Sequence, residues 1–127
     1  ATTGRPRRCG WLDLNVVKFS HRINGYSSIN MTKLDVLSGI PELEVATHYE
    51  LNGRKLEGQM PSDVEDLGRI KIHTVKMPGW SEDISKCKSK KELPRAAQDY
   101  IDFVEKELGV GISWVGTGPE REAMFLN

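Results

Sequence analysis

Near the end of the chain a helix-type apolar pattern is followed at once by a strand-type pattern, and this pairing constrains the fold most. In the segment 93–108 apolar residues recur at three- and four-residue spacing, with acidic and basic residues on the other face. These apolar residues are Ala97, Tyr100, Ile101, Val104 and Leu108. Pro94 suits the first turn of such a helix, and Gly109 suits its end. The apolar run 110–115 predicts an α/β fold in which this strand joins the same sheet as the others.

A second amphipathic helix is predicted over residues 11–24. Its apolar stripe, which we expect to be the packed face, consists of Leu12, Val16, Phe19 and Ile23. Asp13 lies near the start, where an acidic side chain caps a helix or meets its dipole, and Gly25 is expected to end the helix. We interpret Trp11 as a core residue and not as a platform for base stacking.

The middle of the chain has the pattern of strands joined by tight turns. Residues 27–37 form a mixed apolar run that predicts a strand ending in a loop, and residues 43–51 alternate as in a half-exposed strand. Asn52 and Gly53 follow immediately and are a strong signal for a β-hairpin with a return strand.

Two later stretches complete the predicted scaffold. One residue of the pair 62–63 is expected to cap a brief helical turn, and residues 70–75 are expected to form another strand. The Pro-Gly pair 78–79 halts that strand. Trp80 comes next, and we expect it to pack against the sheet and not to touch a ligand.

The charge balance limits the classes of partner. Among 127 residues, 18 Lys and Arg oppose 18 Asp and Glu, so neither nucleic acid nor a membrane surface is favoured as a partner. No apolar run approaches the roughly 20 residues of a membrane-spanning helix. Cys9 and Cys87 lie far apart with no histidine at ligand spacing, so two reduced thiols are expected. We therefore expect a cytoplasmic protein.

The first eight residues hold two hydroxyls, a glycine and three guanidinium groups, with no acidic residue among them. In an extended segment residues two apart face the same side, so Arg5 and Arg7 can direct two planar cationic groups at one anion. Thr2 and Thr3 add hydroxyl donors, and a carboxylate or a phosphate fits such a clamp. The alternative is a solvated basic tail that binds polyanions without specificity.

Two further segments carry groups suited to a purine ring. Asp35 can accept hydrogen bonds from both N1–H and the exocyclic amine of guanine, and the aliphatic stem of Lys33 can lie along the ring face. Gly116 and Gly118 allow backbone amides to face a bound ring. Taken alone, the first segment equally fits a turn-forming aspartate beside a solvated lysine.

Four motifs, in the same order, resemble adenylosuccinate synthetases. They lie at residues 2–13, 31–37, 77–80 and 116–121. The first of them resembles the L-aspartate-binding loop of that family and the start of the following helix. The resemblance extends over essentially the whole chain but covers only the C-terminal third or so of the family's length.

The resemblance implies that residues 1–127 are the C-terminal portion of a mostly parallel-sheet, P-loop-NTPase-like α/β enzyme, with a β-hairpin and two main helices in this portion. The family's phosphate-binding loop, its catalytic residues and its Mg²⁺ contacts belong to the N-terminal part. No Gly-x₄-Gly-Lys-Ser/Thr loop occurs in this sequence. The chain by itself is therefore expected to be inactive, with no catalytic residues and no Mg²⁺ ligands.

The activity that the resemblance implies is a ligase that joins IMP and L-aspartate into adenylosuccinate in AMP biosynthesis, with GTP and Mg²⁺, usually as a homodimer. In that reaction the γ-phosphoryl group of GTP activates O6 of IMP, and the aspartate amine then displaces it. The alternatives are a stand-alone anion- or phosphate-binding module without catalysis and a partner-binding fragment without a ligand.

The resemblance also assigns site residues. Aspartate and IMP would be bound by Ala1, Thr2, Thr3, Gly4, Arg5, Pro6 and Arg7. Arg5 would reach the IMP ribose as well, and Arg7 would reach the GTP side of the site. GTP would be held, through its guanine, by Lys33, Leu34, Asp35, Gly116, Thr117 and Gly118. Gly118 N–H is the candidate donor to O6 of the guanine.

Overall fold

The computed structural model describes residues 10–127. The helices are α1 (Leu14–Asn24), α2 (Val64–Leu67) and α3 (Arg95–Leu108), with 3-10 turns η1 (Leu34–Leu37) and η2 (Lys90–Glu92). The strands are β1 (Leu12–Asp13), β2 (Ser28–Met31), β3 (Glu42–Leu51), β4 (Arg54–Leu56), β5 (Lys71–Pro78), β6 (Gly111–Gly116) and β7 (Met124–Leu126). The predicted α/β class, with one hairpin and two longer helices, is confirmed.

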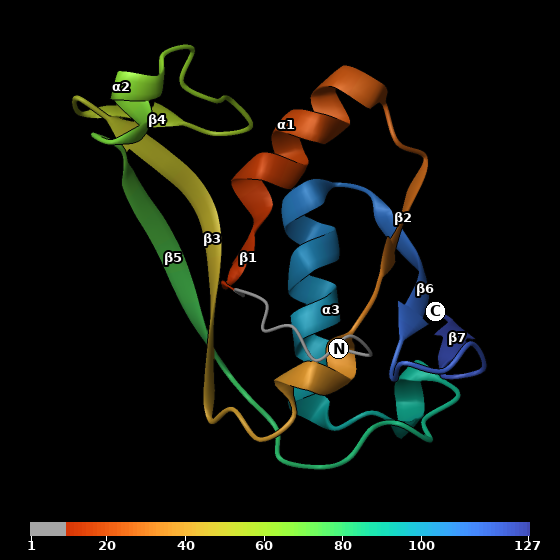
Figure 1. Ribbon diagram of the computed structural model, residues 1–127. Helices are drawn as coiled ribbons and strands as arrows, with labels where there is room; N and C mark the ends of the chain where they lie inside the picture. The colour runs from red at the N-terminus through yellow and green to blue at the C-terminus, as the bar shows by residue number, and fades with distance from the viewer. Residues whose placement is uncertain (1–9) are drawn as a thin grey trace, which may run out of the picture.

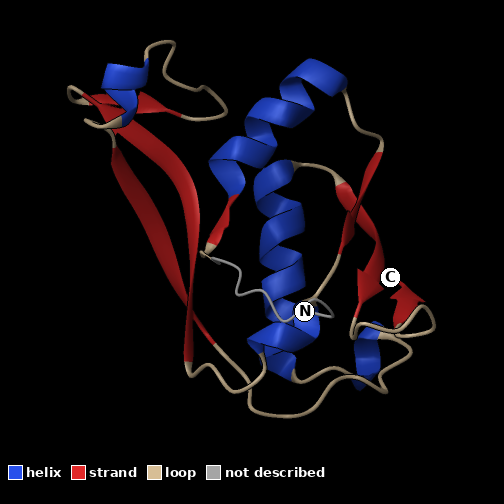
Figure 2. Cartoon of the chain, viewed as in Figure 1, coloured by secondary structure: helices blue, strands red, loops and turns tan. Residues whose placement is uncertain are grey.

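The strands form two separate sheets with the long helices between them (Figures 1 and 2). In the four-stranded sheet β3 pairs in parallel with β1 and in antiparallel fashion with β4 and β5. In the three-stranded sheet β6 pairs in parallel with β2 and in antiparallel fashion with β7. The prediction that β6 joins the same sheet as the others is wrong, because the chain leaves α3 on the side away from β3 and meets β2 there.

The strongest sequence signals are confirmed. All five predicted apolar residues of α3 are buried, and Gly109 ends this helix in the left-handed conformation at φ 70°. Asn52 and Gly53 both have positive φ, 52° and 80°, as a tight hairpin turn between β3 and β4 requires. Asp63 caps α2 by accepting a hydrogen bond from the backbone N–H of Glu65.

Helix α1 packs by a different face from the predicted one. Three residues of the stripe expected to be packed are exposed, at 44% for Val16, 37% for Phe19 and 66% for Ile23. The buried residues are Leu14, which joins the core, and Asn15 and Lys18, whose polar atoms bind main-chain atoms of other segments. Burial of polar side chains costs little when each of them finds such partners.

The start of this helix also differs from the prediction. Residues 12–13 pair with β3, so α1 begins at Leu14 and not at Trp11. Trp11 is 45% exposed, so its interpretation as a core residue is wrong. Asp13 is the N-cap, as expected, and accepts hydrogen bonds from the backbone N–H groups of Asn15 and Val16.

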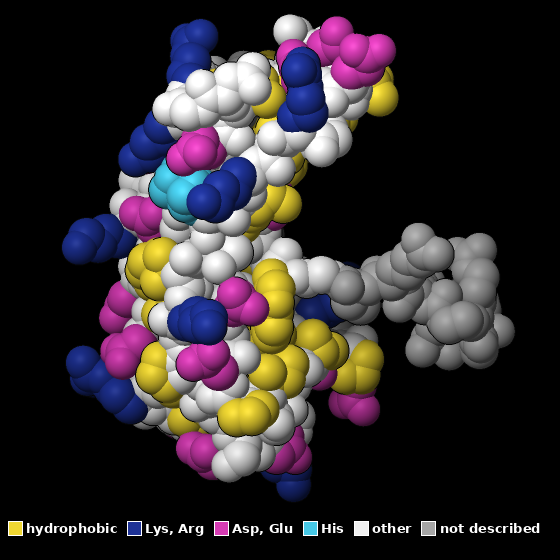
Figure 3. Space-filling model, turned by 90° about the vertical axis from the view of Figure 1, so that its left-hand side faces the viewer, with side chains coloured by type: hydrophobic (Ala, Val, Ile, Leu, Met, Phe, Trp, Pro, Cys, Tyr) yellow, Lys and Arg dark blue, Asp and Glu magenta, His cyan; other side chains and the backbone are white. Residues whose placement is uncertain are grey.

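The outer face of the β3–β5 pair carries side chains of both charges interspersed with exposed hydrophobic ones (Figure 3). Lys76 and Glu42 lie 3.9 Å apart there, and His73 lies 3.3 Å from Glu50. The opposite face of β3 is apolar and packs towards the helices. None of the helices in the described part of the chain is long and apolar enough to cross a membrane.

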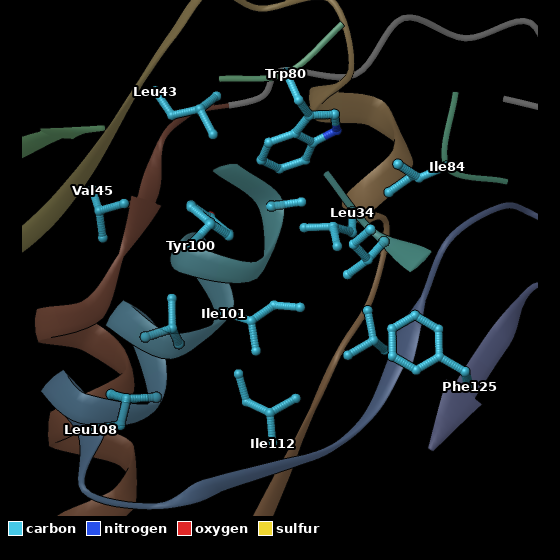
Figure 4. Packing of buried hydrophobic residues seen from close by; sticks show 14 of the residues in the cluster. Leu34, Leu43, Val45, Trp80, Ile84, Tyr100, Ile101, Leu108, Ile112 and Phe125 are labelled. Carbon is cyan, nitrogen blue, oxygen red and sulfur yellow. The ribbon is translucent and has the colours of Figure 1, made fainter. Parts of the chain in front are cut away.

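The core lies between the two sheets and surrounds α3 (Figure 4). It joins residues that are far apart in the sequence. These include Leu34, Leu43, Val45, Trp80, Ile84, Ile101, Ile112 and Phe125. Trp80 is buried, as predicted, and its ring meets that of Tyr100 edge-on, with centroids 6.1 Å apart.

Candidate functional site

The carboxyl ends of β2 and β6 lie side by side. The two strands are parallel neighbours with Met31 opposite Val115, so the segments that follow them leave the sheet at the same edge. A Cβ atom placed on Gly116 would lie 3.3 Å from Cα of Thr32 and 3.6 Å from the backbone nitrogen of Lys33. The structure therefore brings together two segments that sequence reasoning had linked only by analogy.

We call this place the strand-end site. It consists of Thr32, Lys33, Asp35, Gly116, Thr117 and Gly118. In open α/β structures, ligands collect where neighbouring parallel strands end, because loops diverge there and leave room between them. The arrangement thus places the two segments predicted to bind guanine side by side.

Lys33 gives the first segment of this site its shape. Its backbone is left-handed (φ 59°, ψ 33°), which ends the extended run after β2 and starts the turn η1. This explains why the predicted strand over 27–37 stops at Met31. A left-handed conformation at a residue other than glycine costs about 1 kcal/mol or more, and such residues cluster at functional sites.

The side chains of η1 divide between the core and the site. Leu34 is buried among the core residues, so its main chain alone is available to a ligand (Figure 4). Asp35 is half-buried in the same turn, and its carbonyl oxygen accepts a hydrogen bond of 3.1 Å from Ser38 N–H. Lys33 is exposed. A carboxylate and an ammonium group therefore flank one buried anchor.

The second segment contains a buried hydroxyl group without a partner. Thr117 is fully buried, and its N–H donates to the carbonyl oxygen of Ala123 at 2.8 Å. Its Oγ1 has no hydrogen-bond partner among residues 10–127. An unsatisfied buried polar group costs about 1 to 3 kcal/mol.

Gly118 has a packing role that the sequence did not reveal. A Cβ atom there would lie 2.9 Å from Cβ of Ala123, closer than side-chain carbons approach each other. The missing side chain thus allows the loop between β6 and β7 to fold back on itself. This close approach holds the backbone of Gly118 beside the strand ends.

The predicted aspartate and IMP residues, Ala1 to Arg7, lie outside the described residues, and Arg7 as a GTP contact lies there too. The described chain begins next to the strand-end site, because Gly10 and Lys33 line the same cavity of about 380 Å³. Leu12 and Val36 contribute to its apolar wall.

A hydrogen bond links the start of α1 to the four-stranded sheet. The Tyr49 hydroxyl donates a hydrogen bond to the Asp13 carboxylate, which also caps α1. Burial, followed by this hydrogen bond, raises the pKa of Tyr49. The hydroxyl therefore stays protonated and keeps its role as donor.

Sequence reasoning missed the residues that support η1 from behind. Trp80 Nε1–H donates to Ser38 Oγ at 3.0 Å, directly after the turn that carries Asp35. The sequence signal that could have pointed to these residues was the motif at 77–80, to which no ligand was assigned. Within residues 10–127 no three His, Cys, Asp or Glu side chains gather as metal ligands do.

Comparison with known proteins identifies the family. The family model described as adenylosuccinate synthetase matches residues 1–125. The adenylosuccinate synthetase of Paramecium tetraurelia is 48% identical over 126 residues, which are 99% of this chain and 29% of that protein. The Candida tropicalis protein of the same name is 52% identical over 124 residues, which are 98% of this chain and 29% of that protein.

A solved structure agrees with these matches. The fully ligated adenylosuccinate synthetase from Plasmodium falciparum is similar to this chain with a TM-score of 0.93 and 41% identity, over 99% of this chain and 30% of that one. The chain spans about 29% of the length of the curated relatives it matches. It therefore belongs to the adenylosuccinate synthetase family.

Proposed function

We propose that this chain is the C-terminal part of a GTP-dependent ligase that joins IMP and L-aspartate in AMP biosynthesis, and that it supplies the guanine site. The observation that carries the proposal is the convergence of residues 32–35 and 116–118 at the ends of two parallel neighbouring strands. Family membership supports the activity of the whole enzyme, of which this chain is less than a third.

The strand-end site has the groups that guanine needs. The Asp35 carboxylate accepts from N1–H and from the exocyclic amine, which adenine cannot offer together. The backbone N–H of Gly118 donates to O6, and the stem of Lys33 covers one ring face.

The remaining assignments extend the same proposal. Thr2, Thr3, Arg5 and Arg7 hold the carboxylates of aspartate and so orient its amine for attack, a contribution to rate through positioning. Arg5 also reaches the IMP ribose, and Arg7 reaches GTP. The whole enzyme uses Mg²⁺ bound by residues outside this chain, and it works in the cytoplasm as a homodimer.

The test is Asp35→Asn in the intact enzyme, meaning an adenylosuccinate synthetase of the relatives' length that carries this segment. The new amide places a donor against the exocyclic amine of guanine, which should weaken GTP use by about 2 to 4 kcal/mol. Xanthine has a carbonyl at that position, so preference should move from GTP towards XTP. The measurement is kcat/KM for both nucleotides.

Asp99→Asn is the matched control, because Asp99 is exposed on α3 and far along the chain from the site. It should leave the ratio of GTP to XTP use unchanged. If Asp35→Asn also leaves that ratio unchanged and lowers only stability, Asp35 is a turn-forming residue and the guanine assignment is wrong.

A further inference from the structure

Gly79 and Trp80 hold the segment that follows η1. Gly79 N–H donates to the carbonyl oxygen of Pro41 at 2.9 Å, and Gly39 N–H donates to that of Trp80 at 2.8 Å. Trp80 Nε1–H donates to Ser38 Oγ at 3.0 Å. We call these five residues, Ser38, Gly39, Pro41, Gly79 and Trp80, the Trp80 brace.

The brace is directly linked to the turn that carries Asp35. Ser38 receives the indole hydrogen bond on its side chain, and its N–H donates to the carbonyl oxygen of Asp35 at 3.1 Å. Ile40 N–H likewise donates to the carbonyl oxygen of Leu37 at 3.2 Å. A shift of the brace would therefore move the main chain of Asp35.

Trp80 anchors the brace in the hydrophobic core. Trp80 is 4% exposed and packs edge-on against Tyr100 of α3. In Figure 4 the side chains of Trp80 and Leu34 both point into the core. Close packing restricts both side chains to single positions. The turn η1 is thus held on its inner side by Leu34 and at its end by Trp80.

Gly79 is required at its position by close approach and not by its backbone conformation, since its φ is not positive. A Cβ atom there would lie 1.8 Å from the carbonyl oxygen of Ile40 and 2.9 Å from its carbonyl carbon. Both are backbone atoms and cannot move aside as a side-chain tip can. The two segments can therefore approach this closely only with glycine at residue 79.

We propose that the Trp80 brace is a positioning element that sets the base specificity of the guanine site by fixing Asp35. Trp80 touches no ligand in this role. A carboxylate that must accept two hydrogen bonds from one base has to be held to within about 0.5 Å, which requires a supporting layer of packed side chains. The inference rests on the proposed guanine site and adds the residues that hold Asp35 in position.

The test is Trp80→Phe in the intact enzyme. Phenylalanine keeps an aromatic ring against Tyr100 but has no N–H for Ser38. KM for GTP should rise about fivefold, the equivalent of one neutral hydrogen bond, with discrimination between GTP and XTP reduced. The KM for aspartate and kcat should stay the same, because the proposed role of the brace acts through Asp35, which is assigned to guanine and not to aspartate.

Ser38→Ala removes the other partner of the same hydrogen bond. It should reproduce the Trp80→Phe effect on GTP, and the double variant should show no further loss, because both changes remove one interaction. Ile101→Val is the matched control for core packing, since Ile101 is fully buried in α3 and outside the brace. It should lower the melting temperature without changing KM for GTP.

The outcomes separate the two proposals. If Asp35→Asn changes base preference while the brace variants behave like Ile101→Val, the brace is only part of the core and this inference is overturned. If Asp35→Asn leaves base preference unchanged, the guanine site and the brace inference both fail. A rise in KM for GTP in both single variants, without additivity, supports the brace.

Discussion

Asn15 provides a sharp test of how a polar side chain is accommodated on the buried face of α1. Its side chain is fully buried, and its Oδ1 accepts a hydrogen bond of 2.7 Å from the backbone N–H of Gly58. Its Nδ2 donates to the carbonyl oxygen of Gln59 at 2.9 Å. One carboxamide thus replaces the water that two main-chain groups after β4 would otherwise bind.

Asn15→Ala should reduce the free energy of unfolding by about 2 to 4 kcal/mol. The loss of two hydrogen bonds contributes about 1 kcal/mol each, and Gly58 N–H, left buried without a partner, adds about 1 to 3 kcal/mol. Gln59 is exposed, so water can reach its carbonyl oxygen and limit that part of the loss.

The assay is equilibrium urea unfolding of the chain, followed by circular dichroism, with the slope in urea compared between variants. Asn30→Ala is the matched control, because Asn30 is exposed on β2, and its change should stay below about 0.5 kcal/mol. Equal losses in the two variants would refute the reasoning, since the buried hydrogen bonds would then contribute nothing specific.

Asn15→Asp separates the loss of the donor from the loss of packing. The carboxylate still accepts from Gly58 N–H but faces the carbonyl oxygen of Gln59. Burial of the new carboxyl should raise its pKa above that in the unfolded chain, so its protonated form is favoured in the fold. The deficit should therefore shrink as the pH falls, which unfolding at pH 5 and pH 8 would show.

Three further predictions concern other parts of the molecule. Burial, followed by the charge of Lys55, lowers the pKa of His48. As the pH drops below about 6.5, the unfolded chain therefore binds a proton at this residue before the folded chain does, and the free energy of unfolding falls. His48→Gln should reduce this loss of stability at acid pH, measured by urea unfolding. Gly53→Ala forces a side chain to φ 80° and should cost about 1 kcal/mol, whereas Gly68→Ala at φ −73° should not. In the intact enzyme Arg5→Leu should reduce kcat/KM for aspartate roughly ten- to a hundredfold with GTP affinity nearly intact, because a charged bidentate contact is worth about 1.5 to 3 kcal/mol; unchanged aspartate kinetics would show a basic tail.

Where the sequence predicted structure correctly, the cause is local. The apolar face of α3 follows from spacing within one helix, and its end at Gly109 follows from a backbone conformation that glycine adopts easily. The hairpin follows from the same property of Asn52 and Gly53. Neither depends on distant parts of the chain.

The sequence misjudged α1 because periodicity reports where apolar residues lie and not which face finds partners. Val16, Phe19 and Ile23 form the better apolar stripe, yet the buried residues are Leu14, Asn15 and Lys18. Lys18 Nζ donates to the carbonyl oxygen of Thr47 at 3.1 Å and lies within 4 Å of two glutamates. These partners come from distant segments, so no local pattern reveals them.

The same distinction applies to the candidate site. By itself the sequence determined the site's chemistry, since Asp35, Lys33 and the glycines at 116 and 118 have hydrogen-bonding and steric properties that any fold would keep. Only the tertiary structure decided that the two segments lie side by side, through the parallel register of β2 and β6, and that Trp80 donates a hydrogen bond to Ser38 just after η1. Local dihedral preferences act over a few residues, whereas strand pairing and core packing join segments that the chain keeps far apart.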